Sequence, residues 1–62
     1  MTVKVISSRE LSAVEKTKIA DIMATSQCPN ESLINSIEDC YGLNNGFVII
    51  GSQSNHEYTI TY

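Results

Sequence analysis

The chain of 62 residues has one histidine, His56, which is its only side chain with an unperturbed pKa near neutral pH. A general base of this kind needs an acidic neighbour that orients it. Glu57 is adjacent in sequence, but consecutive residues of a strand point to opposite faces, so the two side chains do not readily pair. No serine lies in a G-x-S-x-G motif, and the partners of a catalytic triad are missing. The sequence therefore predicts no catalytic residue, and we expect a protein that is not an enzyme.

The two cysteines, Cys28 and Cys40, are the next candidates for chemistry. Together with His56 they cannot complete a four-ligand zinc site without a carboxylate, and no C-x-x-C pair is present. In a chain with no predicted secretion signal, such a pair is more often two reduced thiols than a disulfide. The glycines follow the spacing of turns and do not form a phosphate-binding G-x-G-x-x-G motif. We expect neither a metal nor a cofactor.

Seven acidic residues against four basic ones give a net charge of −3. This balance opposes direct binding to nucleic acid, where affinity comes largely from lysine and arginine on phosphates. An acidic surface can instead dock on a basic groove of a larger protein, which can itself be a nucleic-acid-binding one. Glu31, Glu38 and Asp39 are the candidate anionic patch. The alternative is that these carboxylates only keep the protein in solution.

The longest apolar run is 47–50, far shorter than the roughly 20 residues of a membrane-spanning helix. The first residues also lack the features of a signal peptide. We therefore expect no membrane insertion and a location in the cytoplasm.

The first half of the chain predicts a strand and a capped helix. Residues 2–7 alternate and are rich in β-branched side chains, which predicts a strand with Val3 and Val5 on one face. Ser12 followed by Glu15 is a capping box, so a helix is expected from residue 13 to about residue 25. Its inward side chains are predicted to be Ile19, Ile22 and Met23.

Pro29 separates this helix from the next element, because it lacks an amide hydrogen and restricts the residue before it. Apolar residues then recur at helical spacing from Leu33 to Tyr41, which predicts a second helix from residue 31 to residue 41, with Asn30 as its N-cap. Glu31, Glu38 and Asp39 fall on its polar side.

The last third predicts two strands, at residues 47–50 and 56–62, joined as a hairpin. If residue 51 pairs with residue 56, then Ile49 faces Tyr58 and Phe47 faces Ile60 on the side that meets the helices. The opposite face is then left open. It is predicted to carry Val48, Ile50, Thr59, Thr61 and Glu57, with Ile6 joining from the first strand.

These elements predict one α+β domain over residues 1–62, with the order β-α-α-β-β. We expect a small three-stranded antiparallel sheet with both helices on one face. An exposed apolar patch at Val48 and Ile50 often marks a protein contact, although a longer loop, the N-terminus or the first helix could also cover it. The last strand is a candidate sheet edge, which can recruit a strand from a partner or from a second copy as a homodimer.

Four short strings resemble a known family in their order along the chain: 3–7, 11–12, 33–39 and 46–49. They resemble the C-terminal domain of the delta (oligomycin-sensitivity) subunit of ATP synthase. The resemblance implies a stalk-binding module that is not itself catalytic. It also implies an extended segment in place of the helix predicted after Pro29.

The sequence thus leads to two expectations of function. The first is a non-enzymatic interaction protein that docks on a larger protein or complex and modulates or inhibits it. Acidic proteins of this size are frequently phage products that block host machinery such as CRISPR or restriction effectors, which makes that context the favoured one. The second is a structural subunit of a multi-protein assembly, such as a stalk element.

Overall fold

The computed structural model describes all 62 residues, in the order β1-α1-α2-β2-β3-β4. Strand β1 (Thr2–Ser7) buries Val3 and Val5 and leaves Lys4 exposed, so the predicted strand and its two faces are confirmed. Helix α1 (Ala13–Thr25) has the predicted bounds. Its capping box is present, because the Glu15 amide donates to Ser12 Oγ at 3.2 Å and the Ser12 amide donates to Glu15 Oε1 at 3.3 Å.

Helix α2 (Pro29–Ser36) is shorter than the predicted helix of residues 31–41. It ends because Ile37 is extended and Asp39 has a φ of 63°, a left-handed value that interrupts a helix. The residues after it form strand β2 (Cys40–Asn44), which the sequence prediction missed. Of the residues predicted to be helical, those up to Ser36 are helical, whereas Cys40 and Tyr41 lie in a strand.

Strand β2 is joined to strand β3 (Phe47–Ile50) by a tight hairpin. The two residues between the strands, Asn45 and Gly46, have φ values of 55° and 85°. Positive φ at both central positions is the signature of a type I′ turn, for which Asn-Gly is the preferred pair. This turn closes the hairpin that begins on β2.

The sheet has four strands in the order β2-β3-β1-β4 and is mixed, so the prediction of a three-stranded antiparallel sheet is wrong. Strand β4 (His56–Thr61) pairs antiparallel with β1, and β1 pairs parallel with β3. The predicted β3–β4 hairpin does not form, because β1 lies between its two strands. The connecting residues 51–55 cross the end of β1, where the Ser8 amide donates to the Ile50 carbonyl at 2.9 Å.

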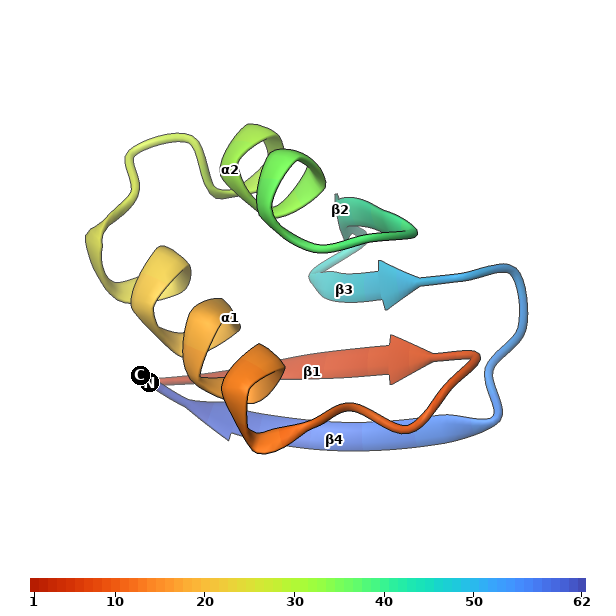
Figure 1. Ribbon diagram of the computed structural model, residues 1–62. Helices are drawn as coiled ribbons and strands as arrows, with labels where there is room; N and C mark the ends of the chain where they lie inside the picture. Colours follow the sequence, from red (N-terminus) through yellow and green to blue (C-terminus); the bar gives the residue numbers. More distant parts are fainter.

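Both helices pack on the same face of the sheet (Figure 1), so the α+β architecture and the single helix layer are as predicted. Ile19 of α1 and Leu33 of α2 are fully buried against the sheet. Ile22 and Met23 are partly buried against the same core. The core consists of Val3, Val5, Leu11, Ile19, Leu33, Ile37, Cys40, Val48, Ile50 and Ile60.

Val48 and Ile50 belong to this core and are 0% exposed, so their predicted place on the open face is wrong. The error comes from the pairing partner. Val48 is level with Val5 on β1, which faces the helices, whereas the prediction aligned β3 directly with β4. Because side chains alternate along a strand, pairing with β1 buries Val48 and Ile50 and places Phe47 and Ile49 on the open face.

Neither helix has the length and the apolar character that crossing a membrane requires.

Candidate functional site

The sheet face opposite the helices is not covered by any element. The register places Phe47, Lys4 and Thr59 in one row across this face, and Ile49, Ile6 and Glu57 in the next row. We call this surface the open face; it also carries Thr2 and Thr61. Its apolar members, Ile6, Phe47 and Ile49, are half-buried and lie side by side on β1 and β3. We call these three residues the apolar strip.

Polar groups border the apolar strip on the β4 side. Lys4 Nζ lies 3.1 Å from Glu57 Oε1, and both side chains are at least half exposed. Thr59 and Thr61 are exposed on the same strand. An ion pair this exposed contributes little to stability, so these groups can exchange their partners in a complex at small energetic cost.

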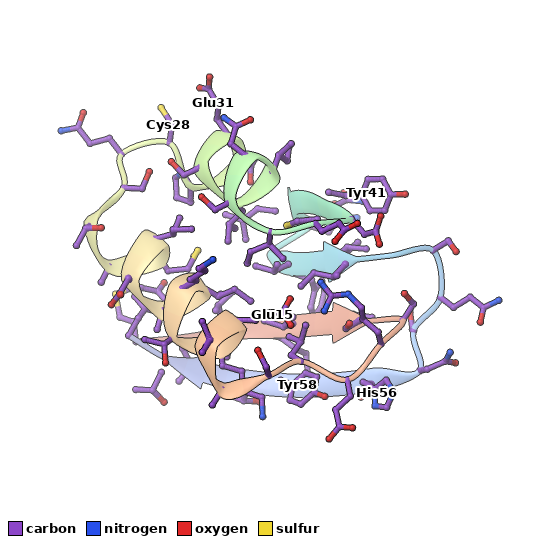
Figure 2. The ribbon with its side chains drawn as sticks, in the orientation of Figure 1. Glu15, Cys28, Glu31, Tyr41, His56 and Tyr58 are labelled. Atoms are coloured by element: carbon purple, nitrogen blue, oxygen red, sulfur yellow. The ribbon has the colours of Figure 1, made fainter.

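Tyr41 extends the open face on the β2 side. Cys40 before it is buried toward the helices, so alternation directs Tyr41 away from them, and this residue is 62% exposed. Figure 2 shows this side chain on β2 pointing out of the molecule. A tyrosine beside an apolar patch is typical of a protein-binding surface, because it offers both apolar area and a hydroxyl.

The structure thus brings some of the predicted site residues to the open face and not others. Glu57, Thr59 and Thr61 lie there, with Ile6 beside them as predicted. Phe47, Ile49 and Tyr41 were missed. Alternation already put Phe47 and Ile49 opposite Val48, but only the parallel pairing with β1 shows which set is buried.

The three predicted acidic residues do not form one helix face. Glu31 lies in the first turn of α2, and Figure 2 shows it pointing away from the sheet. Glu38 and Asp39 follow the end of α2, in the turn that leads into β2. The hydrogen bond with Glu15 is the largest cause of the raised pKa of Arg9, and the charges of Asp39 and Glu38 add to it. The anionic patch is therefore divided between the two ends of α2.

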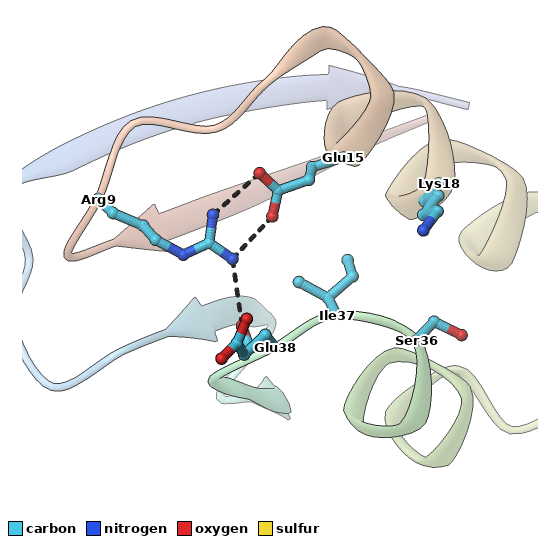
Figure 3. A pocket seen from close by; sticks show the side chains of 6 residues that line it. All are labelled: Arg9, Glu15, Lys18, Ser36, Ile37 and Glu38. Atoms are coloured by element: carbon cyan, nitrogen blue, oxygen red, sulfur yellow. Dashed lines mark hydrogen bonds and ion pairs between the residues drawn. The ribbon is translucent and has the colours of Figure 1, made fainter.

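Arg9, in the loop after β1, is held by a forked ion pair (Figure 3). Its Nη1 lies 2.9 Å from Glu15 Oε1, and its Nη2 lies 2.7 Å from Glu15 Oε2. The same Nη2 donates to the Glu38 carbonyl at 3.2 Å. The guanidinium thereby ties the start of α1 to the turn after α2, which are far apart in sequence.

A polar hollow of about 450 Å³ lies beside this ion pair (Figure 3). Its lining residues are Arg9, Glu15, Lys18, Ser36, Ile37 and Glu38. The hydrogen bond from Arg9 holds the pKa of Glu15 below its ordinary value, so this carboxylate is a weak proton acceptor near neutral pH. Because the Arg9 guanidinium already bonds to Glu15 and to the Glu38 carbonyl, it holds the start of α1 and the turn after α2 together.

His56 and the cysteines lie apart from one another. His56 is exposed, and its ring stacks at 6.4 Å from that of Tyr58 (Figure 2); Glu57 points to the opposite face, as predicted. Cys28 is exposed and Cys40 buried, and burial raises the pKa of the Cys40 thiol. Histidine, cysteine and carboxylate side chains do not gather anywhere in a group of three that could hold a metal ion.

Comparison with protein-family models, curated proteins and solved structures finds no match for this chain. The resemblance to the delta subunit of ATP synthase therefore remains a prediction from short strings.

Proposed function

We propose that the protein is a non-enzymatic binding module that docks on a larger protein through the open face and modulates or inhibits that protein. One observation carries the proposal. The four-stranded sheet has helices on one face only, and the other face presents the apolar strip and Tyr41 beside a polar margin. Apolar centres with polar rims are the usual anatomy of protein interfaces, and a contiguous exposed apolar patch often marks one.

The partner that fits this surface is a protein with an apolar contact area. Basic groups at its border would meet Glu57, which is more than half exposed. The net charge of −3 favours such a partner through attraction over longer range. In this proposal the protein acts in the cytoplasm and needs no cofactor, and inhibition of host machinery by a phage product is the favoured setting.

Affinity capture with matched variants tests this proposal. The tagged protein and its Ile49→Lys variant are used to capture proteins from cells that express the chain, and bound proteins are quantified by mass spectrometry. The control is Val14→Lys, which makes the same kind of change at an apolar residue on α1 that is 65% exposed. We expect one partner that is retained by the wild type and the control and reduced at least about tenfold by Ile49→Lys.

Equal capture by all three proteins would contradict the proposal, provided that thermal unfolding shows the Ile49→Lys variant to be folded. The identity of the captured protein also separates the two expected functions. A nuclease or other effector points to an inhibitor, and several stoichiometric subunits of one complex point to a structural role.

A further inference from the structure

The two edges of the sheet differ in how well they are protected. Strand β2 has a bulge between Cys40 and Leu43, and the Leu43 amide donates to Asn30 Oδ1 at 2.6 Å. The Gly42 amide is directed to Cys40 Sγ at 3.3 Å. Bulges and occupied amides are devices that stop an edge strand from pairing with another chain. Strand β2 is therefore a closed edge.

Strand β4 has none of these devices. It has no proline, no glycine and no bulge, and it packs only on β1 and α1. At its end, the Met1 amine donates to the Tyr62 carbonyl at 2.9 Å and the Tyr62 amide donates to the Met1 carbonyl at 2.8 Å. In an antiparallel ladder such pairs alternate, so Tyr58 and Ile60 also bond to β1.

The remaining β4 residues, Glu57, Thr59 and Thr61, consequently direct their backbone N–H and C=O groups outward. They form an open edge, at which the N–H and C=O groups of alternate residues are free to bond to another strand. We propose that this edge pairs antiparallel with β4 of a second copy of the chain, about a two-fold axis at Thr59. The proposal does not depend on the proposed function, because it uses the edge of the sheet and not the open face.

The register follows from the residues themselves. With Thr59 facing Thr59 of the second copy, Glu57 faces Thr61, and each facing pair exchanges both of its N–H···O bonds. Any shift leaves one of the three outward residues without a counterpart, and centring on Glu57 would set two carboxylates opposite each other. On the helix side, the same register places Tyr58 beside Ile60 of the second copy, a favourable aromatic and β-branched pair.

Helix α1 leaves room for a second copy above this edge. Lys16 lies over the Tyr58 ring, 4.5 Å from its centroid, which identifies the side of α1 that faces β4. Ala13, Thr17 and Ala24 lie farther round the helix from Lys16, toward solvent, and all three are exposed and small. Short side chains let two helices approach closely, so the helix layers of two copies can lie side by side over a continuous sheet.

Hydrogen exchange measured by NMR on the full chain tests the pairing. At high protein concentration we expect slow exchange for the amides of Glu57, Thr59 and Thr61, which becomes fast on dilution. The amides of Tyr58 and Ile60 should stay protected at both concentrations, because β1 holds them. Sedimentation should show twice the mass of 6.8 kDa at high concentration.

Thr59→Pro removes an outward amide while sparing the ladder with β1, and proline is tolerated on edge strands. We expect it to raise the dimer dissociation constant at least about tenfold, from the loss of two central hydrogen bonds. Thr59→Lys gives a second variant, because it sets like charges opposite each other. The control is Asn35→Lys, which adds the same charge at an exposed residue of α2 and should leave the dissociation constant unchanged.

Three results would overturn the proposal. One is a monomer at every concentration with fast exchange at the three outward amides. Another is a dimer that persists unchanged in both Thr59 variants. The third is protection of those amides only after another protein is added, which would assign the edge to that protein.

Discussion

At the scale of single residues, the half-buried ion pair between Arg9 and Glu15 connects three segments of the chain. Glu15 serves the capping box of α1 and also receives both arms of the Arg9 guanidinium. Arg9 reaches on to the Glu38 carbonyl. One carboxylate thus connects the start of α1, the loop after β1 and the turn after α2. In a chain with so few core residues, such a tie is expected to fix the helix layer on the sheet.

This role predicts a particular pH dependence for Glu15→Gln. Glutamine keeps the capping box, so the variant removes only the ionic contribution. Arg9 lowers the pKa of Glu15 in the folded state, so the stabilisation is present above the ordinary pKa of 4.5 and is lost as the pH falls below it. We expect the variant to be less stable by about 1 kcal/mol at pH 7, since both side chains are partly exposed.

Urea unfolding followed by circular dichroism between pH 7 and pH 3 measures this difference. The wild type and Glu15→Gln should converge at the acidic end. Glu10→Gln is the control, because Glu10 is exposed and forms no ion pair. A difference that stays constant or grows below pH 4 would show that the ionised carboxylate is not the cause.

At the scale of elements, the connection from β3 to β4 is the feature that defines the topology. It crosses the end of β1 at Gly51, which has a φ of 80°. A Cβ atom there would lie 1.8 Å from Ser8 Oγ and 2.7 Å from Ser8 Cβ. The glycine is therefore required twice, once by its backbone angle and once by the approach of the crossing chain to β1.

Gly51→Ala and Gly46→Ala separate these two requirements. Gly46 has a similar φ of 85°, but a Cβ there would meet nothing within 4 Å. We expect Gly46→Ala to lose about 1 to 2 kcal/mol of stability from backbone strain alone. Gly51→Ala should lose about 2 to 4 kcal/mol, because the contact with Ser8 adds to the strain.

Chemical denaturation of both variants gives the comparison, and Ser8→Gly in the Gly51→Ala background should recover part of the additional loss. Equal losses of stability for the two glycine variants would mean that a Cβ at position 51 does not clash with Ser8.

The elements also show how far the sequence predicts this fold. Local signals were sufficient for β1, for α1 with its cap, and for the strands around residues 48 and 58. They failed at residues 37–41, where the spacing of Ile37, Cys40 and Tyr41 fits a helix but pairing with β3 makes the chain extended. The Asn45-Gly46 turn was the signal that could have revealed β2, because that pair is typical of a hairpin between two strands.

The open face was predicted only in part, for a related reason. Alternation correctly separated Phe47 and Ile49 from Val48 and Ile50. Which pair is buried depends on the strand that lies beside β3. That strand is β1, which lies between β3 and β4, and the local sequence pattern does not predict this long-range pairing. The β4 residues Thr59 and Thr61 were assigned correctly because their strand alternates around Tyr58 and Ile60.

At the scale of the whole molecule, the protein is a one-sided sheet. Helices α1 and α2 bury Val5, Val48 and Ile50 completely, whereas the apolar strip on the other side is only half-buried. In this chain of 62 residues both helices lie on the same face of the sheet, so neither covers the open face. We therefore propose that a larger protein covers the open face.

Site-specific photo-crosslinking tests this claim most directly. A benzophenone amino acid replaces either Tyr41, beside the apolar strip, or Val14, on the outer side of α1; these residues are 62% and 65% exposed. After irradiation in cells that express the chain, we predict one discrete adduct with a larger protein from position 41 and none from position 14. An adduct from position 14 with none from position 41 would contradict the claim, because the partner would then bind the helix layer.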